Sequence, residues 1–132
     1  HPLAGRSSIR LEELATERFV GLRRAQALRR LTDELCEAAG FVASVAFESG
    51  DLSTVQGFVS AGLGVDVVPA PRSRSPYAGG GAVAYLPLDD PGASREVGVV
   101  WSAERRLLPA ADAFRRHVVD RARAGLLPPI LS

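Results

Sequence analysis

The chain has 132 residues, of which 46% are hydrophobic, and its 16 basic and 15 acidic residues leave a net charge of +1. This length allows one domain, or one domain and part of a second, and the apolar share excludes a chain that is disordered throughout. The balanced charge excludes a broad basic surface for nucleic acid. No apolar run approaches the roughly 20 residues that span a bilayer, so we expect no membrane partner.

From residue 19 to residue 40, a strand signal is followed by a helix signal. The apolar run at 19–22 predicts a buried strand, and leucines at 28, 31 and 35 recur at helical spacing, which predicts a helix over 26–39. Gly40 suits the left-handed position that ends such a helix. Arg29 with Asp33, four residues apart, is expected as a charge pair on the solvent-facing side.

The alternation continues with a strand at 42–47, a helix at 52–61 and a strand at 65–69. Asp51 stands at the N-cap position of the second helix. A strand-helix-strand-helix-strand order in about 50 residues indicates a parallel sheet with helical crossovers. Gly62 and Gly64 precede the last of these strands, so they predict a helix end and a tight turn rather than a phosphate loop.

The second half of the chain is less regular. Residues 70–81 mix Pro, Ser, Arg and Gly and predict a loop. Strands are expected at 82–86 and 96–101, joined by the turn residues Asp-Asp-Pro-Gly at 89–92. A last helix is expected over 109–124, with Pro109 in its first turn.

Cys36 and His117 are residue types that serve as nucleophile and base, but both fall inside predicted helices and no third group is marked. A free cysteine usually behaves as a small buried hydrophobe. We therefore expect no enzyme. A lone cysteine without a disulfide partner is typical of the reducing cytosol, so a cytoplasmic protein is expected. Two histidines and one cysteine offer no clustered metal-ligand spacing, and no cofactor is expected.

Several stretches, in the same order along the chain, resemble the effector-binding domain of LysR-type transcriptional regulators. The most specific is FVSAGLGV at 58–65, followed by Val67, Val68 and Pro69. The others are HPLAGR at 1–6, LEELATERFV at 11–20, LPL at 86–88, REVGVVW at 95–101 and the segment 107–114. Each match is weak alone, and their shared order carries the resemblance.

The resemblance implies an α/β fold like that of type 2 periplasmic binding proteins. In such a fold two α/β subdomains are joined by two crossing strands, and a small effector binds between them to control transcription. It assigns residues 19–97 to a complete second subdomain, and residues 1–18 and 98–132 to remnants of the first. It also implies an N-terminal winged helix-turn-helix that binds DNA and is absent here, so we expect a truncated regulator. A free solute-binding protein, a free-standing small α/β domain and an oligomerising domain are the alternatives.

The candidate effector site lies beyond the carboxyl ends of the first two predicted strands, where ligands of open α/β sheets bind. Two guanidinium groups there suit a carboxylate, although two solvated arginines are an equally good interpretation. The loop at 48–51 faces the same region, and its alternative interpretation is capping, with Asp51 as the N-cap and Glu48 and Ser49 as solvated loop residues. The candidates are Arg23, Arg24, Gln26, Glu48, Ser49 and Pro69.

Two positions depart from the family's pattern. Family members often carry Ser or Thr in the loop before the first helix of this subdomain, whereas this chain has LRRAQ at 22–26, so the class of effector is not implied. Asp66 stands where the family usually has a small apolar residue. A carboxylate inside a strand must face solvent or find a donor.

The resemblance also implies a dimer to which the first long helix and the strand after it contribute. The strand at 42–47 carries no charge, and an exposed edge of this kind invites pairing with another chain. We therefore expect self-association through about residues 26–47.

Overall fold

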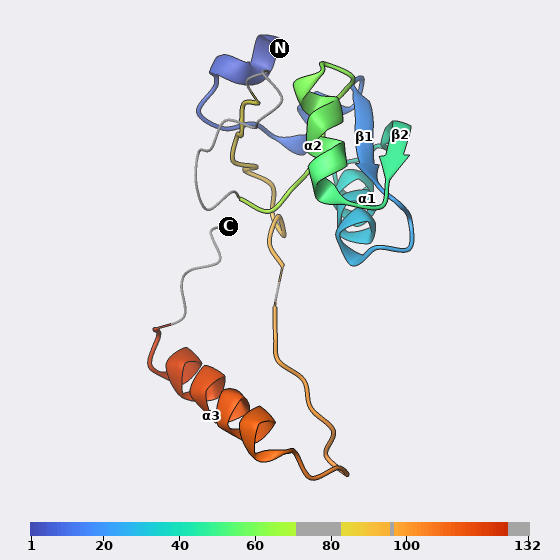
Figure 1. The fold of residues 1–132 in the computed structure, drawn as a ribbon. Coiled ribbons are helices and arrows are strands. Elements are labelled where there is room, and N and C mark those ends of the chain that lie inside the picture. Colours follow the sequence, from blue (N-terminus) through green and yellow to red (C-terminus); the bar gives the residue numbers. More distant parts are fainter. Residues whose placement is uncertain (71–82, 96, 127–132) are drawn as a thin grey trace. The chain divides into compact units, whose positions relative to one another are not determined.

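The computed structural model of the chain describes residues 1–70, 83–95 and 97–126. The chain divides into two compact units, residues 1–94 and residues 95–130. In chain order the elements are the 3-10 helices η1 (Pro2–Gly5) and η2 (Leu11–Leu14), strand β1 (Arg18–Leu22), helix α1 (Ala27–Ala38), strand β2 (Ser44–Ser49), helix α2 (Leu52–Ser60) and helix α3 (Pro109–Arg123) (Figure 1). The mixed α/β architecture predicted from the sequence is confirmed.

Strands β1 and β2 form a parallel sheet, and α1 is the crossover between them, as the alternating signals predicted. Arg18 lies opposite Ser44 and Leu22 lies opposite Ser49, with one irregularity in register after Phe19. The second strand begins at Ser44 rather than at Val42, because its partner β1 begins opposite Ser44.

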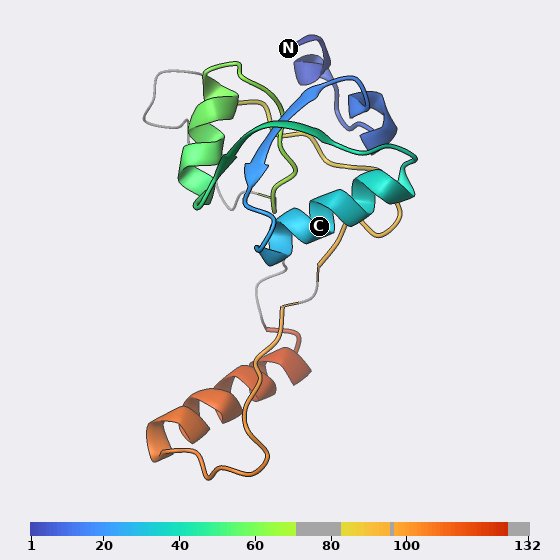
Figure 2. The same ribbon diagram turned by 90° about the vertical axis from the view of Figure 1, so that its right-hand side faces the viewer.

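The two helices of the first unit cover opposite faces of β1. Phe19 is buried in one core cluster with Cys36 of α1, and Val20 is buried in a second cluster with Val55 of α2. Neighbouring strand residues point to opposite faces, so α1 covers the face of Phe19 and α2 covers the face of Val20. Figure 2 shows β1 between the two helices. The N-terminal segment completes the first cluster with Ile9, Leu11 and Leu14.

The strand predicted at 65–69 is reduced to a single bridge. Val65 exchanges two backbone hydrogen bonds of 2.9 Å with β1, on the edge away from β2. The next N–H along that edge, from Val67, is bound by the carboxylate of Asp66 at 2.8 Å, and Pro69 has no N–H to donate. The prediction of a full third strand is therefore wrong, because a side chain and a proline take the place of the ladder.

The prediction of a strand at 82–86 is also wrong, because the described residues 83–86 form no strand. Residue 82 and residues 71–81 of the predicted loop lie outside the described residues. The chain pairs two residues later, where Leu88 forms an isolated parallel bridge with Ile9. The pairing ends at once because the Asp90 carboxylate accepts the N–H of Leu11 at 2.7 Å.

In the second unit, the strand predicted at 96–101 does not form among residues 97–101, and residue 96 lies outside the described residues. Several side chains here are exposed, Val100 by 92%, and none of the described residues pairs with this backbone, which a strand requires. Helix α3 follows with Pro109 in its first turn, as predicted. Its Arg115 guanidinium lies 5.2 Å from the ring centre of Trp101.

The glycines that follow the three helices have the left-handed backbone that ends a helix. Gly40, Gly62 and Gly125 have φ angles of +89°, +75° and +66°. Gly64 is required for a different reason, namely space: a Cβ at this position would lie 2.4 Å from the carbonyl oxygen of Arg18. Gly62 therefore ends α2, as predicted, and Gly64 lets the chain approach β1.

Candidate functional site

The carboxyl ends of β1 and β2 are followed by two short loops that lie side by side. Arg23 donates its backbone N–H to the Ser49 carbonyl at 3.0 Å, and Gln26 Nε2 donates to the Gly50 carbonyl at 2.7 Å. The Arg23 guanidinium also lies over Gly50, with Cζ 3.8 Å from the position that a Cβ would take. Parallel strands end at the same sheet edge, which is why these two loops meet.

The two arginine candidates are exposed, and within the described residues their side chains make no hydrogen bond or ion pair. Arg23 and Arg24 are thus available to an anion at this edge. Pro69 is half-buried and shares no hydrogen bond with the two loops in the described part of the chain. Its place in the site stays a prediction.

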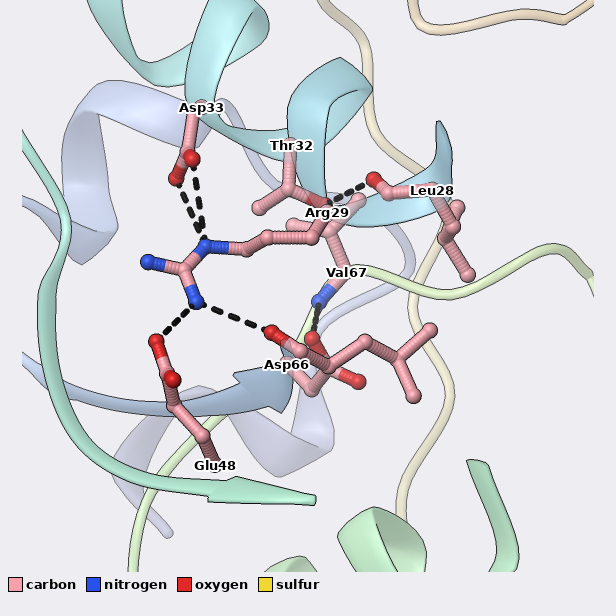
Figure 3. A network of polar contacts seen from close by, with 8 residues as sticks. Leu28, Arg29, Thr32, Asp33, Glu48, Asp66 and Val67 are labelled. Carbon is pink, nitrogen blue, oxygen red and sulfur yellow. Dashed lines mark hydrogen bonds and ion pairs between the residues drawn. The ribbon is translucent and has the colours of Figure 1, made fainter. Parts of the chain in front are cut away.

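Glu48 has a different environment from the one expected. Its Oε1 accepts a hydrogen bond of 2.6 Å from Nη1 of Arg29, so its carboxylate is turned toward α1 (Figure 3). The same Nη1 donates to the Leu22 carbonyl at 2.9 Å. Nε of Arg29 donates to both carboxylate oxygens of Asp33, at 2.9 and 3.1 Å. One guanidinium therefore joins α1 to the ends of both strands.

Arg29 was expected on the solvent-facing side of its helix, and that expectation is wrong. Its ion pair with Asp33 exists, but Arg29 itself is 5% exposed. Gly21 makes room for it, since the Arg29 Cδ lies 3.9 Å from where a Cβ of Gly21 would be. Burial opposes the charge of Arg29, yet the hydrogen bonds to Glu48 and Asp33 outweigh it and hold its pKa above the ordinary value.

Asp66 is a half-buried polar residue that the site prediction also left out. Its Oδ1 accepts the N–H of Val67, whereas Oδ2 is buried and has no hydrogen-bond partner in the described structure. Burial raises the pKa of Asp66 to about 7, although the Val67 N–H and the charge of Arg29 act in the opposite direction. In the sequence, this position is a departure from the family's pattern. The hydrogen-bond donor that a carboxylate needs there is present for Oδ1 only.

The loop after β2 has a capping role as well. Asp51 caps α2 by accepting the N–H of Thr54 at 2.9 Å, and this backbone hydrogen bond lowers the pKa of Asp51. The Ser49 hydroxyl donates to Asp51 at 3.3 Å. The capping interpretation of this loop is correct for Asp51, and the Ser49 side chain belongs to the same cap.

Cys36 is fully buried in the core cluster around Phe19. Burial is the main reason that its thiol pKa is raised to about 11, and the negative charge of Asp33 adds to the effect. The group is therefore a neutral thiol at physiological pH and behaves as the small hydrophobe that the sequence predicted.

The described residues offer neither a metal site nor a membrane-spanning helix. No group of three or more His, Cys, Asp or Glu side chains among them is placed to hold a metal ion. None of the helices they form is long and apolar enough to cross a membrane.

Sequence reasoning missed the burial of Arg29 for a physical reason. The buried stripe of α1 consists of Arg29, Thr32 and Cys36, at helical spacing, whereas the leucines that defined the predicted stripe are only half-buried. A stripe read from apolar residue types cannot include an arginine. The signal in the sequence is Gly21 of β1, which faces Arg29 and leaves room for its side chain.

Residues 1–123 match the family model described as the LysR substrate binding domain. The chain belongs to the LysR substrate-binding domain family. It is similar to the regulator named "Uncharacterized HTH-type transcriptional regulator YybE" of Bacillus subtilis (strain 168), with 36% identity over 91% of this chain and 40% of that protein. This LysR domain thus spans well under half the length of that relative.

Solved structures agree with the family. The C-terminal domain of a probable LysR family transcriptional regulator from Rhodococcus sp. RHA1 superposes with a TM-score of 0.73 and 29% identity, over 90% of this chain and 58% of that one. The effector-binding domain of QuiR, solved in complex with shikimate, has the same fold, with a TM-score of 0.75 and 20% identity over 96% of this chain and 59% of that one. The predicted fold class of this LysR domain is thus confirmed.

Proposed function

We propose that this LysR domain is the effector-sensing part of a transcriptional regulator and that it binds a small carboxylate at the loops after β1 and β2. The observation that supports this most directly is the pair of exposed guanidinium groups, Arg23 and Arg24, at the carboxyl ends of a parallel sheet. Arginine binds carboxylates through two parallel hydrogen bonds. A shikimate carboxylate is one ligand of this chemistry, bound by the QuiR domain.

The roles of the candidate residues differ in this proposal. Arg23 and Arg24 contact the effector, and Gln26 and Ser49 hold the two loops together through the bonds that join them. Glu48 is held by Arg29, so it shapes the site rather than contacting the ligand. Pro69 borders the site in the segment after Val65.

The proposal extends to the whole protein in three respects. DNA binding would belong to a helix-turn-helix segment outside this chain, as in the relative named a helix-turn-helix-type regulator. The working compartment would be the cytoplasm, where a regulator meets its promoter. Dimerisation would use residues 26–47, which include α1 and most of β2.

Titration of the full-length protein with shikimate and other small carboxylic acids, followed by calorimetry, tests the effector site. A charge-assisted hydrogen-bonded contact is worth about 1.5–3 kcal/mol, so Arg23→Ala is expected to weaken the Kd of a bound acid by about tenfold or more. Arg30→Ala removes the same charge from an exposed position of α1 and is the matched control. Equal affinity for both variants would remove Arg23 from the site.

A further inference from the structure

Asp66 and the Arg29 network meet at one small cavity. It has a volume of about 10 Å³ and is lined by Leu22, Leu28, Arg29, Thr32, Asp66 and Val67. This is about the space that a single water molecule needs, which excludes a metabolite. Both the buried Arg29 and Asp66, whose Oδ2 is buried without a hydrogen-bond partner in the described structure, therefore border a space that leaves room for a side chain to shift.

The hydrogens of Arg29 that face this region are already used. Its Nη1 carries two hydrogens, and they go to the Leu22 carbonyl and to Glu48. Figure 3 shows the other terminal nitrogen pointing away from Asp66. Asp66 can therefore gain a hydrogen bond from Nη1 only if one of the two present acceptors leaves.

The two acceptors do not leave with equal ease. Leu22 is 8% exposed, so its carbonyl would be left buried without a donor, at a cost of about 1–3 kcal/mol. The Glu48 side chain is 41% exposed and can return to water. Glu48 is thus the partner that gives way.

We propose that Asp66 and Glu48 compete for Arg29, so that loss of the Asp66 proton releases Glu48 and removes one of the contacts that hold the carboxyl end of β2, while the backbone pairing with β1 remains. With Asp66 neutral, Arg29 ties α1 to β1 and β2. With Asp66 charged, the tie to β2 is lost while the tie to β1 remains. Because Glu48 precedes Ser49 of the candidate effector loop, Asp66 acts as a positioning residue and makes that loop respond to pH. This last consequence rests on the proposed effector site.

The charge distribution around Asp66 is simple. Arg29 of α1 is the charged group of the described residues that acts on its ionisation, and Asp33 and Glu48 face Arg29 itself. Burial places the pKa of Asp66 at about 7. A neutral and a charged Asp66 are then both populated near physiological pH.

An NMR titration of the chain without ligand tests the competition, with the carboxyl carbons of Asp66 and Glu48 and the amide of Ser49 as probes, from about pH 5 to about pH 9. All three are expected to change with one shared midpoint near 7. Asp66→Asn should abolish the step at Glu48 and Ser49. Glu34→Gln, on the exposed face of α1, should keep it.

An Asp66 midpoint below about 5, near its unperturbed value, overturns the proposal. So does a step at Ser49 that survives in Asp66→Asn, or the absence of a step in the wild type. If circular dichroism shows that Asp66→Asn does not fold, the wild-type titration alone tests the proposal: equal midpoints for Asp66 and Glu48 support it, and different midpoints overturn it. Since no effector is present, a negative result leaves the proposed effector site standing, and failure of effector binding leaves this result unchanged.

Discussion

At the scale of single residues, the chemistry of this domain is set by two polar side chains in apolar surroundings. Arg29 satisfies its charge with two carboxylates and a carbonyl, whereas Asp66 has only one backbone donor. The sequence identified Asp66 as unusual, because a strand carboxylate needs a donor, but it gave no partner. The partner depends on how the helix rotates against the sheet, which residue types alone do not determine.

The raised pKa of Asp66 predicts a stability that falls as pH rises. An acid whose pKa moves from 3.8 to about 7 on folding holds a proton that the unfolded chain has already released, so the free energy of unfolding decreases between these two pH values. Between pH 5 and pH 8 the loss is at most about 3 kcal/mol. Urea unfolding of the wild type should show this slope, and Asp66→Asn should flatten it.

Glu34→Gln is the control for this measurement, because it changes one acid on the exposed face of α1. Glu13, Asp51 and Asp112 have lowered pKa values, so their contributions vary only at more acidic pH and do not interfere. A wild type that is equally stable at pH 5 and pH 8 would show that Asp66 is charged throughout this range.

At the scale of elements, the helices were predictable from the sequence, whereas of the predicted strands only those at 19–22 and 42–47 formed, as β1 and β2. The three helices predicted at 26–39, 52–61 and 109–124 formed at Ala27–Ala38, Leu52–Ser60 and Pro109–Arg123. Their signals are local: periodicity, an N-cap and a glycine after the end. A strand exists only where another backbone pairs with it, so the segments at 65–69 and 97–101 could not be judged from their own residues.

The bridge at Val65 depends on the close approach of Gly64 to β1. We therefore predict that substitution by Ala changes the stability in opposite directions at Gly64 and at Gly57. Gly64→Ala places a Cβ 2.4 Å from the backbone oxygen of Arg18, so the segment must move away from β1 and the free energy of unfolding should fall by several kcal/mol. Gly57→Ala lies inside α2 with open space around it and should raise stability by about 0.5–1 kcal/mol. Chemical denaturation of both variants measures the difference, and a Gly64→Ala variant as stable as Gly57→Ala would contradict the close approach.

At the scale of the whole molecule, this chain consists of two units and belongs to a family whose relative YybE is more than twice as long. Family membership followed from the order of several weak motifs, which a sequence can show. The candidate site could be located only to a sheet edge, since that edge follows from topology. The hydrogen-bond partners of Glu48, Gln26 and Arg23 could not be predicted, because they depend on distances between elements.

The surface of β2 predicts how copies of the chain associate. Within the described residues, β2 has a neighbouring strand on one side only, and its own Phe47 is 45% exposed. An open edge of this kind pairs readily with another strand. We therefore expect sedimentation equilibrium to show a concentration-dependent dimer formed through residues 26–47.

A charge on this edge should oppose dimerisation, but its position matters. Val45 packs against the core around Phe19, so Val45→Lys would destabilise the fold and give no clear answer. Ala46 is exposed, and the register irregularity after Phe19 leaves it without a partner in β1. Ala46→Lys should therefore shift the chain toward monomer, because a paired edge would bury an ammonium group without a counter-charge.

Ala4→Lys is the control, because it adds the same charge at an exposed site of η1, far from this strand in the sequence, and should leave the dimer intact. A wild type that is monomeric at high concentration would show that the predicted association does not occur, and equal dimerisation of both variants would place it elsewhere on the molecule.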